Sequence, residues 1–186
     1  FCGQTLRWTF SRPFYLKNLL KQMEQIGVNS VPVVLTTAIS TGMVLALQSY
    51  TGFKRFGAQS LIGAVVSLSM TRELGPVLTG LMVAGRAGAS MAAELGTMRV
   101  TEQIDALYSL GRDPVPALAA PRLMAGIAVT PLLVGLANLT GILSGMLAAQ
   151  LTVGLGNESF LFGARMFWHS WDMFYSLLKA TVFGFI

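Results

Sequence analysis

A stretch of 23 residues, from Leu61 to Val83, is apolar or weakly polar apart from two adjacent charges at its centre, Arg72 and Glu73. A helix of that length crosses the roughly 30 Å hydrocarbon core of a bilayer. A charged side chain at the middle of such a helix costs about 2.5–3.5 kcal/mol on insertion scales. We therefore expect a membrane-spanning helix whose two charges face protein or a water-filled cavity instead of lipid.

The composition fits a membrane protein. Apolar residues make up 53% and charged residues 11% of the 186-residue chain, whereas soluble domains carry about 25% charged residues. The net charge of +5 does not predict nucleic-acid binding, because the basic residues are spread among apolar segments. The single cysteine, Cys2, excludes an internal disulfide, and the N-terminal segment lacks the compact apolar core of a cleavable signal peptide.

Four apolar segments predict an all-α, polytopic membrane protein. We expect full spans over residues 28–49, 61–83 and 123–150, and a fourth span over residues 171–186. The fourth is too short to cross the bilayer, so we expect this sequence to be a fragment. Two loops are expected between the spans, Tyr50–Ser60 and Leu151–Ser159. The second loop is followed by Phe160–Ser170, which is rich in aromatic residues, as is typical of the membrane–water interface.

The first 27 residues form an N-terminal arm ahead of the transmembrane domain, residues 28–186. Residues 14–26 place leucine, methionine and isoleucine on one stripe and lysine, glutamate and glutamine on the other, with Pro13 at the first helical position. Such a helix fits the headgroup region of a membrane, and we expect it there because a span follows directly. The alternative is an amphipathic helix packed on protein.

Basic residues favour one side of the membrane. The N-terminal arm and the polar stretch 85–122 together carry eight lysine or arginine residues, whereas the opposite side carries three. The positive-inside rule then places the N terminus and residues 85–122 in the cytoplasm.

The fourth span adds Asp172 and Lys179 to the two charges of the second. They are seven residues apart, so they share one side of a helix about 10 Å apart along its axis. Each needs a partner on another helix, and Arg72 with Glu73 supplies one of each sign. Two interpretations stay open: a polar lining for a substrate cavity, or a buried ion-pair network that fixes the helix register.

A short helix is expected in the cytoplasmic stretch, over Glu102–Leu110. Thr101 can cap it, Asp105 lies in its first turn, and Gly111 can end it. A nine-residue helix is not stable alone, so it must dock either on its own membrane domain or on a soluble partner.

Small residues recur at four-residue spacing and allow close contact between helices. The spacing leaves open whether that contact is internal or between two copies of the chain. The residues are Gly80, Ala84 and Gly88, followed by Gly141, Gly145 and Ala149.

Enzyme signatures are absent from the sequence, which has no nucleophile–base constellation, no phosphate-binding Gly-Lys loop and no metal-ligand spacing around its single histidine, His169. We expect a transport subunit and not an enzyme. Two other classes remain as alternatives: an ion-coupled secondary transporter or channel that uses the charged residues, and an integral-membrane lipid-modifying enzyme.

Five motifs in order along the chain carry a family resemblance: Arg72–Val77, Ala84–Gly88, Ala93–Met98, Thr101–Leu107 and Asp113-Pro114. With them the chain resembles the MlaE (YrbE) permease family, the membrane subunits of the Mla and Mce lipid ABC transporters. The resemblance implies a homodimer in the bacterial inner membrane. It also implies a separate cytoplasmic ABC ATPase, a periplasmic MCE-domain lipid-binding protein, and phospholipid transport between the inner membrane and the outer membrane or envelope.

The resemblance also implies roles for individual residues. The lipid cavity and its charges would be formed by Arg72, Glu73, Asp172, Lys179, Leu45 and Gln48, the last two near the outer end of the first span. The ATPase contact would be formed by Glu94, Glu102, Gln103, Ile104, Asp105 and Leu107. No cofactor is expected on this chain, since ATP would be used by the partner. Family members continue through the fourth span into a fifth.

Overall fold

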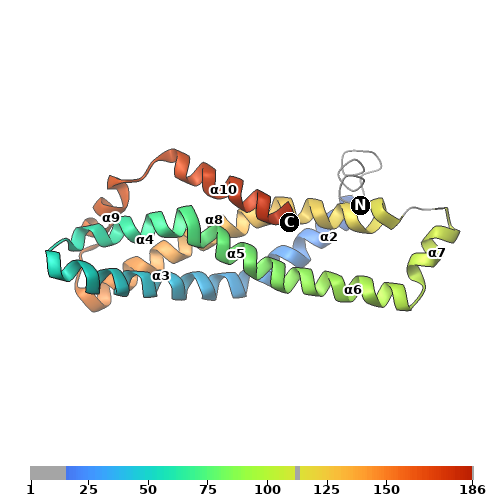
Figure 1. The fold of residues 1–186 in the computed structure, drawn as a ribbon, viewed down its shortest axis with the longest axis horizontal. Coiled ribbons are helices and arrows are strands. Elements are labelled where there is room, and N and C mark those ends of the chain that lie inside the picture. The colour runs from blue at the N-terminus through green and yellow to red at the C-terminus, as the bar shows by residue number, and fades with distance from the viewer. Residues whose placement is uncertain (1–15, 112–113, 186) are drawn as a thin grey trace.

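The computed structural model describes residues 16–111 and 114–185, and every regular element in them is helical (Figure 1). The expectations for Cys2, Pro13 and Asp113 fall outside these residues. The α-helices are α2 (Leu16–Gly27), α3 (Val31–Phe53), α4 (Ile62–Ser69), α5 (Gly75–Val83), α6 (Ala89–Val100), α7 (Gln103–Ser109), α8 (Ala120–Val153), α9 (Asn157–Met166) and α10 (Ser170–Phe185). Short 3₁₀ turns are η1 (Val28–Ser30), η2 (Lys54–Phe56) and η3 (Gln59–Leu61), and π-helical turns are η4 (Met70–Leu74), η5 (Ala84–Gly88) and η6 (Val115–Ala119).

Three helical stretches are long and apolar enough to cross a membrane: Asn18–Phe56, Gln59–Val100 and Ala117–Val153. They contain the three full spans expected from the sequence, which confirms the all-α polytopic class. Helix α10 begins at Ser170, beside the predicted start of the fourth apolar segment.

The second stretch runs for 42 residues, from Gln59 to Val100. At about 1.5 Å per residue it is roughly 63 Å long, about twice the hydrocarbon thickness. The first part of the predicted polar stretch, residues 85–100, is therefore a continuation of the second span, and in Figure 1 α7 follows at the far end of α6.

Helix α8 is the centre of the bundle and packs against α2, α3, α5 and α10. Its closest approach is to α3, where a Cβ on Gly42 would overlap the main-chain carbonyl of Gly141. Ser144 Oγ also donates a hydrogen bond to the Ile39 carbonyl at 3.0 Å. Gly141 and Gly145 thus make an internal contact, whereas a Cβ on Gly88 would meet open space.

The apolar stripe of α2 is partly covered by protein. Ile26 is only 1% exposed and packs beside Val129 of α8, with Leu19 and Met23 at the edge of the same cluster. Leu20 remains 61% exposed. Protein therefore covers part of this stripe, because α8 offers an apolar face to Ile26, and the placement of α2 on the membrane surface stays a prediction.

The aromatic segment after the third span also differs from expectation. Helix α9 begins at Asn157, inside the predicted loop, and folds back along α4. Phe160 is fully buried in the core and does not lie on the surface of the chain. The reason is a close approach of the two helices at Gly63, where a Cβ would overlap the Phe160 carbonyl. Phe162 and Trp168 remain exposed.

Candidate functional site

Two ion pairs join the second membrane stretch to α10. Arg72 Nε donates to Asp172 Oδ1 at 2.8 Å, and Lys179 Nζ donates to Glu73 Oε1 at 2.7 Å. The four side chains, Arg72, Glu73, Asp172 and Lys179, therefore form two pairs of opposite charge, as expected, and are called the charge set below. Asp172 is also held by the main-chain N–H of His169, at 3.1 Å.

The backbone around Arg72 explains why Lys179 is placed where it is. In a regular α-helix the carbonyl of Arg72 would accept from the N–H of residue 76, but Pro76 has no N–H to donate. The helix forms the π-helical turn η4 over Met70–Leu74, and Lys179 Nζ donates to the Arg72 carbonyl at 2.9 Å. Lys179 therefore satisfies both a carboxylate and a carbonyl that proline leaves free. The proline four residues after Arg72 was the sequence signal for this contact.

Neutral polar groups extend the charge set into the bundle. Asn138 of α8, 3% exposed, donates from Nδ2 to Ser176 Oγ of α10 at 3.0 Å. Within the described part of the chain, Asn138 Oδ1 and the hydroxyl of Thr71 are buried without a hydrogen-bond partner. Gly75 leaves room for this amide, since a Cβ there would overlap Asn138 Oδ1 and lie 2.7 Å from the Met70 carbonyl.

The charge set is open on one side. The side chains of Arg72, Glu73 and Lys179 are 49%, 67% and 41% exposed, whereas that of Asp172 is 8% exposed. Asp172 is thus the buried anchor of the set. The other three present polar groups on the surface of this chain at the middle of a span.

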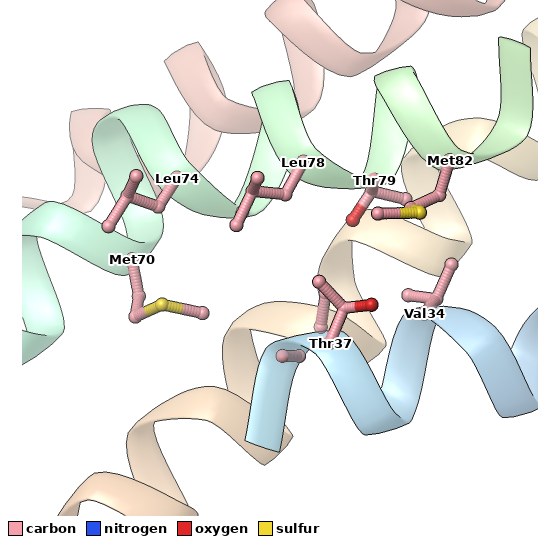
Figure 2. Close-up of a pocket in the computed structure, with 10 residues that line it drawn as sticks. Val34, Thr37, Met70, Leu74, Leu78, Thr79 and Met82 are labelled. Carbon is pink, nitrogen blue, oxygen red and sulfur yellow. The ribbon is translucent and has the colours of Figure 1, made fainter. Parts of the chain in front are cut away.

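An apolar pocket lies on another side of the same helix, between α3 and α5. Figure 2 shows Met70, Leu74, Leu78 and Met82 along one wall, opposite residues of α3 that include Thr37. Its empty volume is about 220 Å³, including space open to the surroundings. The pocket was not expected from sequence, because it depends on how far apart the two helices pack.

Leu45 and Gln48, the two other candidate cavity residues, do not line this pocket. Leu45 is partly buried and packs against the core cluster around Ala46 and Phe160, whereas Gln48 is exposed. Among the described residues, neither takes part in the ion pairs or hydrogen bonds of the four charged side chains.

The predicted cytoplasmic helix is present as α7, Gln103–Ser109, with Ile104 and Leu107 half-buried. The predicted cap is wrong: Thr101 Oγ1 donates back to the Thr97 carbonyl of α6. Glu102 lies before the helix in the left-handed region, at φ 57°, because the chain must turn sharply between two helices. Gly111, at φ 72°, follows the helix as expected.

Two of the acidic residues expected at an ATPase contact are paired within the chain. Glu94 accepts from Arg122 Nη2 at 2.8 Å, which joins α6 to the start of α8. Asp105 pairs with Arg99, and both side chains are more than half exposed. Glu102 and Gln103 are exposed. Among the described residues, no three His, Cys, Asp or Glu side chains gather as metal ligands.

Comparison with known proteins identifies relatives over nearly all of the chain. The family model described as Permease MlaE matches residues 19–186. A probable ABC transporter permease protein of Rickettsia prowazekii is 49% identical, over 94% of this chain and 67% of the relative. A probable ABC transporter permease protein of Synechocystis sp. is 44% identical, over 91% and 65%. The intermembrane phospholipid transport system permease protein MlaE of Haemophilus influenzae is 39% identical, over 89% and 64%. The chain thus spans about two thirds of the length of these relatives.

Proposed function

The chain belongs to the MlaE permease family, and from that premise we propose that it is the membrane subunit of an ABC transporter that moves phospholipids between the inner membrane and the outer membrane or envelope. The name of the Haemophilus relative states the phospholipid cargo, and the names of the Rickettsia and Synechocystis relatives state the ABC permease role. The proposal has the chain as a transport subunit without a cofactor of its own, with ATP hydrolysed by a cytoplasmic partner.

The charge set carries the proposal. Three of its four side chains are 41–67% exposed on the surface of this chain at mid-span. Facing lipid, such groups would be costly, so they require a polar cavity or another protein surface. A homodimer that brings two copies of this surface together would enclose a polar cavity able to accept a phospholipid headgroup. Leu45 and Gln48 would line the same cavity only if the partner copy contributes to it.

The end of α6 and the short helix α7, which follows after a sharp turn, support an ATPase partner. This region carries apolar side chains that the described part of the chain leaves uncovered: Val100 is 84%, Tyr108 60% and Leu110 75% exposed. Uncovered apolar side chains beside charged ones are typical of a binding surface. We place the ATPase there, with Gln103, Ile104 and Leu107 at the contact and Glu102 at its edge. The continuous helix from Gln59 to Val100 would carry motion of the ATPase into the charge set.

Orientation and the remaining partner complete the proposal. The excess of basic residues on the N-terminal arm and on residues 85–122 supports a cytoplasmic N terminus. An MCE-domain lipid-binding protein would then receive or deliver lipid on the periplasmic side.

Reconstitution tests the function. The full-length protein would be placed in proteoliposomes with its ATPase and its MCE-domain partner, and transfer of a fluorescent phospholipid to acceptor vesicles would be followed. We expect transfer that requires ATP and is lost when the ATPase is omitted. Lipid-independent ion flux by the chain alone, driven by an ion gradient, would instead support the secondary-transporter alternative, which the family membership does not favour.

A further inference from the structure

A second pocket lies away from the charge set, between α2 and the start of α6. It is lined by Gln22, Gln25, Ile26, Asn29, Arg86, Ala87, Ser90 and Met91, and its empty volume is about 450 Å³, counted to its open mouth. Its walls are mixed. Five of the eight lining side chains are polar or charged, and the apolar floor is formed by Ile26, Ala87 and Met91.

The polar groups of this pocket suit an anion. Arg86 supplies its only charge, and no carboxylate is among the lining residues. The ion pairs of the described residues do not involve Arg86, whose recorded hydrogen bond runs from Nη1 to Ser30 Oγ at 3.2 Å. Ser30 is 1% exposed and so anchors one edge of the guanidinium. The remaining N–H donors have no partner among the described residues, and a guanidinium fork matches the oxygens of a phosphate.

One of the residues that line this pocket also has an unsatisfied hydrogen-bond acceptor. Gln22 Oε1 is buried and has no hydrogen-bond partner within the described residues. A buried amide oxygen without a donor costs about 1–3 kcal/mol, so a ligand that brings an N–H or O–H group would be favoured. Phosphate with a nearby amine or hydroxyl is the chemistry of a phospholipid headgroup.

The position of the pocket matches the headgroup layer. One wall, Gln22–Asn29, lies at the start of the predicted first span, and the other, Arg86–Met91, comes just after the predicted second span. Two independent hydropathy boundaries therefore meet at this pocket. Beside the pocket, Leu20 of α2 and Val28 of η1 are 61% and 64% exposed and can contact acyl chains.

We propose that this pocket binds the headgroup of a phospholipid in the cytoplasmic leaflet, with Arg86 on the phosphodiester and Gln22 on the headgroup amine or hydroxyl. The proposal rests on the proposed function for the membrane and its orientation. The site is separate from the mid-span charge set and gives the permease a lipid contact at the leaflet surface on the ATPase side.

Photo-crosslinking tests the site. A benzophenone amino acid would replace Met91, which removes no polar contact, in the full-length protein reconstituted with ³²P-labelled phosphatidylethanolamine and phosphatidylglycerol. We expect ultraviolet light to label the protein and Arg86→Gln to reduce the label about tenfold, the effect of losing one strong charge-assisted contact. Arg86→Lys should retain part of it. Arg165→Gln, which removes an exposed arginine on α9, is the matched control and should leave the label unchanged.

A pocket-filling variant and a competitor complete the test. Ser90→Trp should also abolish labelling, and it decides the matter if Arg86→Gln does not fold by circular dichroism. Equal labelling in Arg86→Gln and in the control overturns the proposal. If millimolar inorganic phosphate present during irradiation prevents labelling, the pocket binds free phosphate, and the assignment to a lipid headgroup is wrong. Capture is measured without ATPase or ATP, so capture without ATP-driven transfer rejects the transport function alone, whereas transfer without capture rejects the site alone.

Discussion

Exchanging the charges of Glu73 and Lys179 should first impair transport and then partly restore it. The two side chains are joined at 2.7 Å, and at an effective dielectric constant near 20 their Coulomb attraction is about 6 kcal/mol before desolvation. Their exposures of 67% and 41% reduce this. Exposed pairs in water couple by about 0.2–1 kcal/mol, and removing one partner of a buried pair costs about 3–5 kcal/mol. We expect a coupling of about 1–3 kcal/mol if the pair lines a protein-walled cavity.

The geometry predicts that the rescue is incomplete. Glu73→Lys leaves two unpaired ammonium groups facing each other, and adding Lys179→Glu restores opposite charges. A glutamate at position 179 cannot donate to the Arg72 carbonyl, which Lys179 contacts at 2.9 Å. The double variant should therefore remain about 1 kcal/mol short of the native protein, the net value of one hydrogen bond.

The assay is ATP-dependent phospholipid transfer in proteoliposomes, with thermal unfolding of each variant in detergent as a check on folding. Each single variant should lower the transfer rate about tenfold, which corresponds to about 1.4 kcal/mol, and the double variant should recover part of that loss. Glu158→Lys, at an exposed residue of α9 without an ion pair among the described residues, is the control and should transfer lipid normally. A double variant no better than the worse single variant would refute direct coupling.

Three further predictions follow from the packing and from the proposed contacts. Gly75→Ala should lower the unfolding temperature or prevent folding, since its Cβ overlaps a buried amide, whereas Gly85→Ala meets open space and should fold normally. Leu107→Asp should leave insertion intact but lose the ATPase on co-purification, because it places an unpaired charge in the contact, at a cost of about 3–5 kcal/mol; stoichiometric ATPase with the variant would contradict the assignment. A photo-crosslinker at Leu45 or Gln48 should capture phospholipid in the assembled transporter, and equal capture at the exposed Leu132 would remove the case for a cavity there.

The membrane class and the three full spans follow from sequence, because the bilayer imposes a fixed apolar length on any helix that crosses it. Pairing of the four charges between helices also follows from sequence, since an isolated charge in the middle of a span has a high free-energy cost. Both constraints act on the local composition of the chain. The structure contains the long apolar helices that the first constraint requires, and the pairs Arg72–Asp172 and Glu73–Lys179 that the second requires. The family resemblance carried by five motifs agrees with the match over residues 19–186.

Other features depend on distances between helices that no local pattern contains. Phe160 lies in a segment with the aromatic composition typical of the membrane–water interface, but its side chain is buried because α9 approaches α4 closely at Gly63. The stripe of α2 is expected at the membrane surface, and only the packing of α8 determines that Ile26, within that stripe, is buried against protein.

The hydrogen bond from Lys179 to the Arg72 carbonyl depends on both the sequence and the packing of the helices. Pro76 determines from sequence alone that the Arg72 carbonyl lacks its helical donor. Only the packing of α10 against α5 determines that a lysine ammonium, held by Glu73, supplies the replacement. A chain specifies which groups must be satisfied, since that depends on covalent structure. Which group satisfies them depends on the positions of elements about a hundred residues apart.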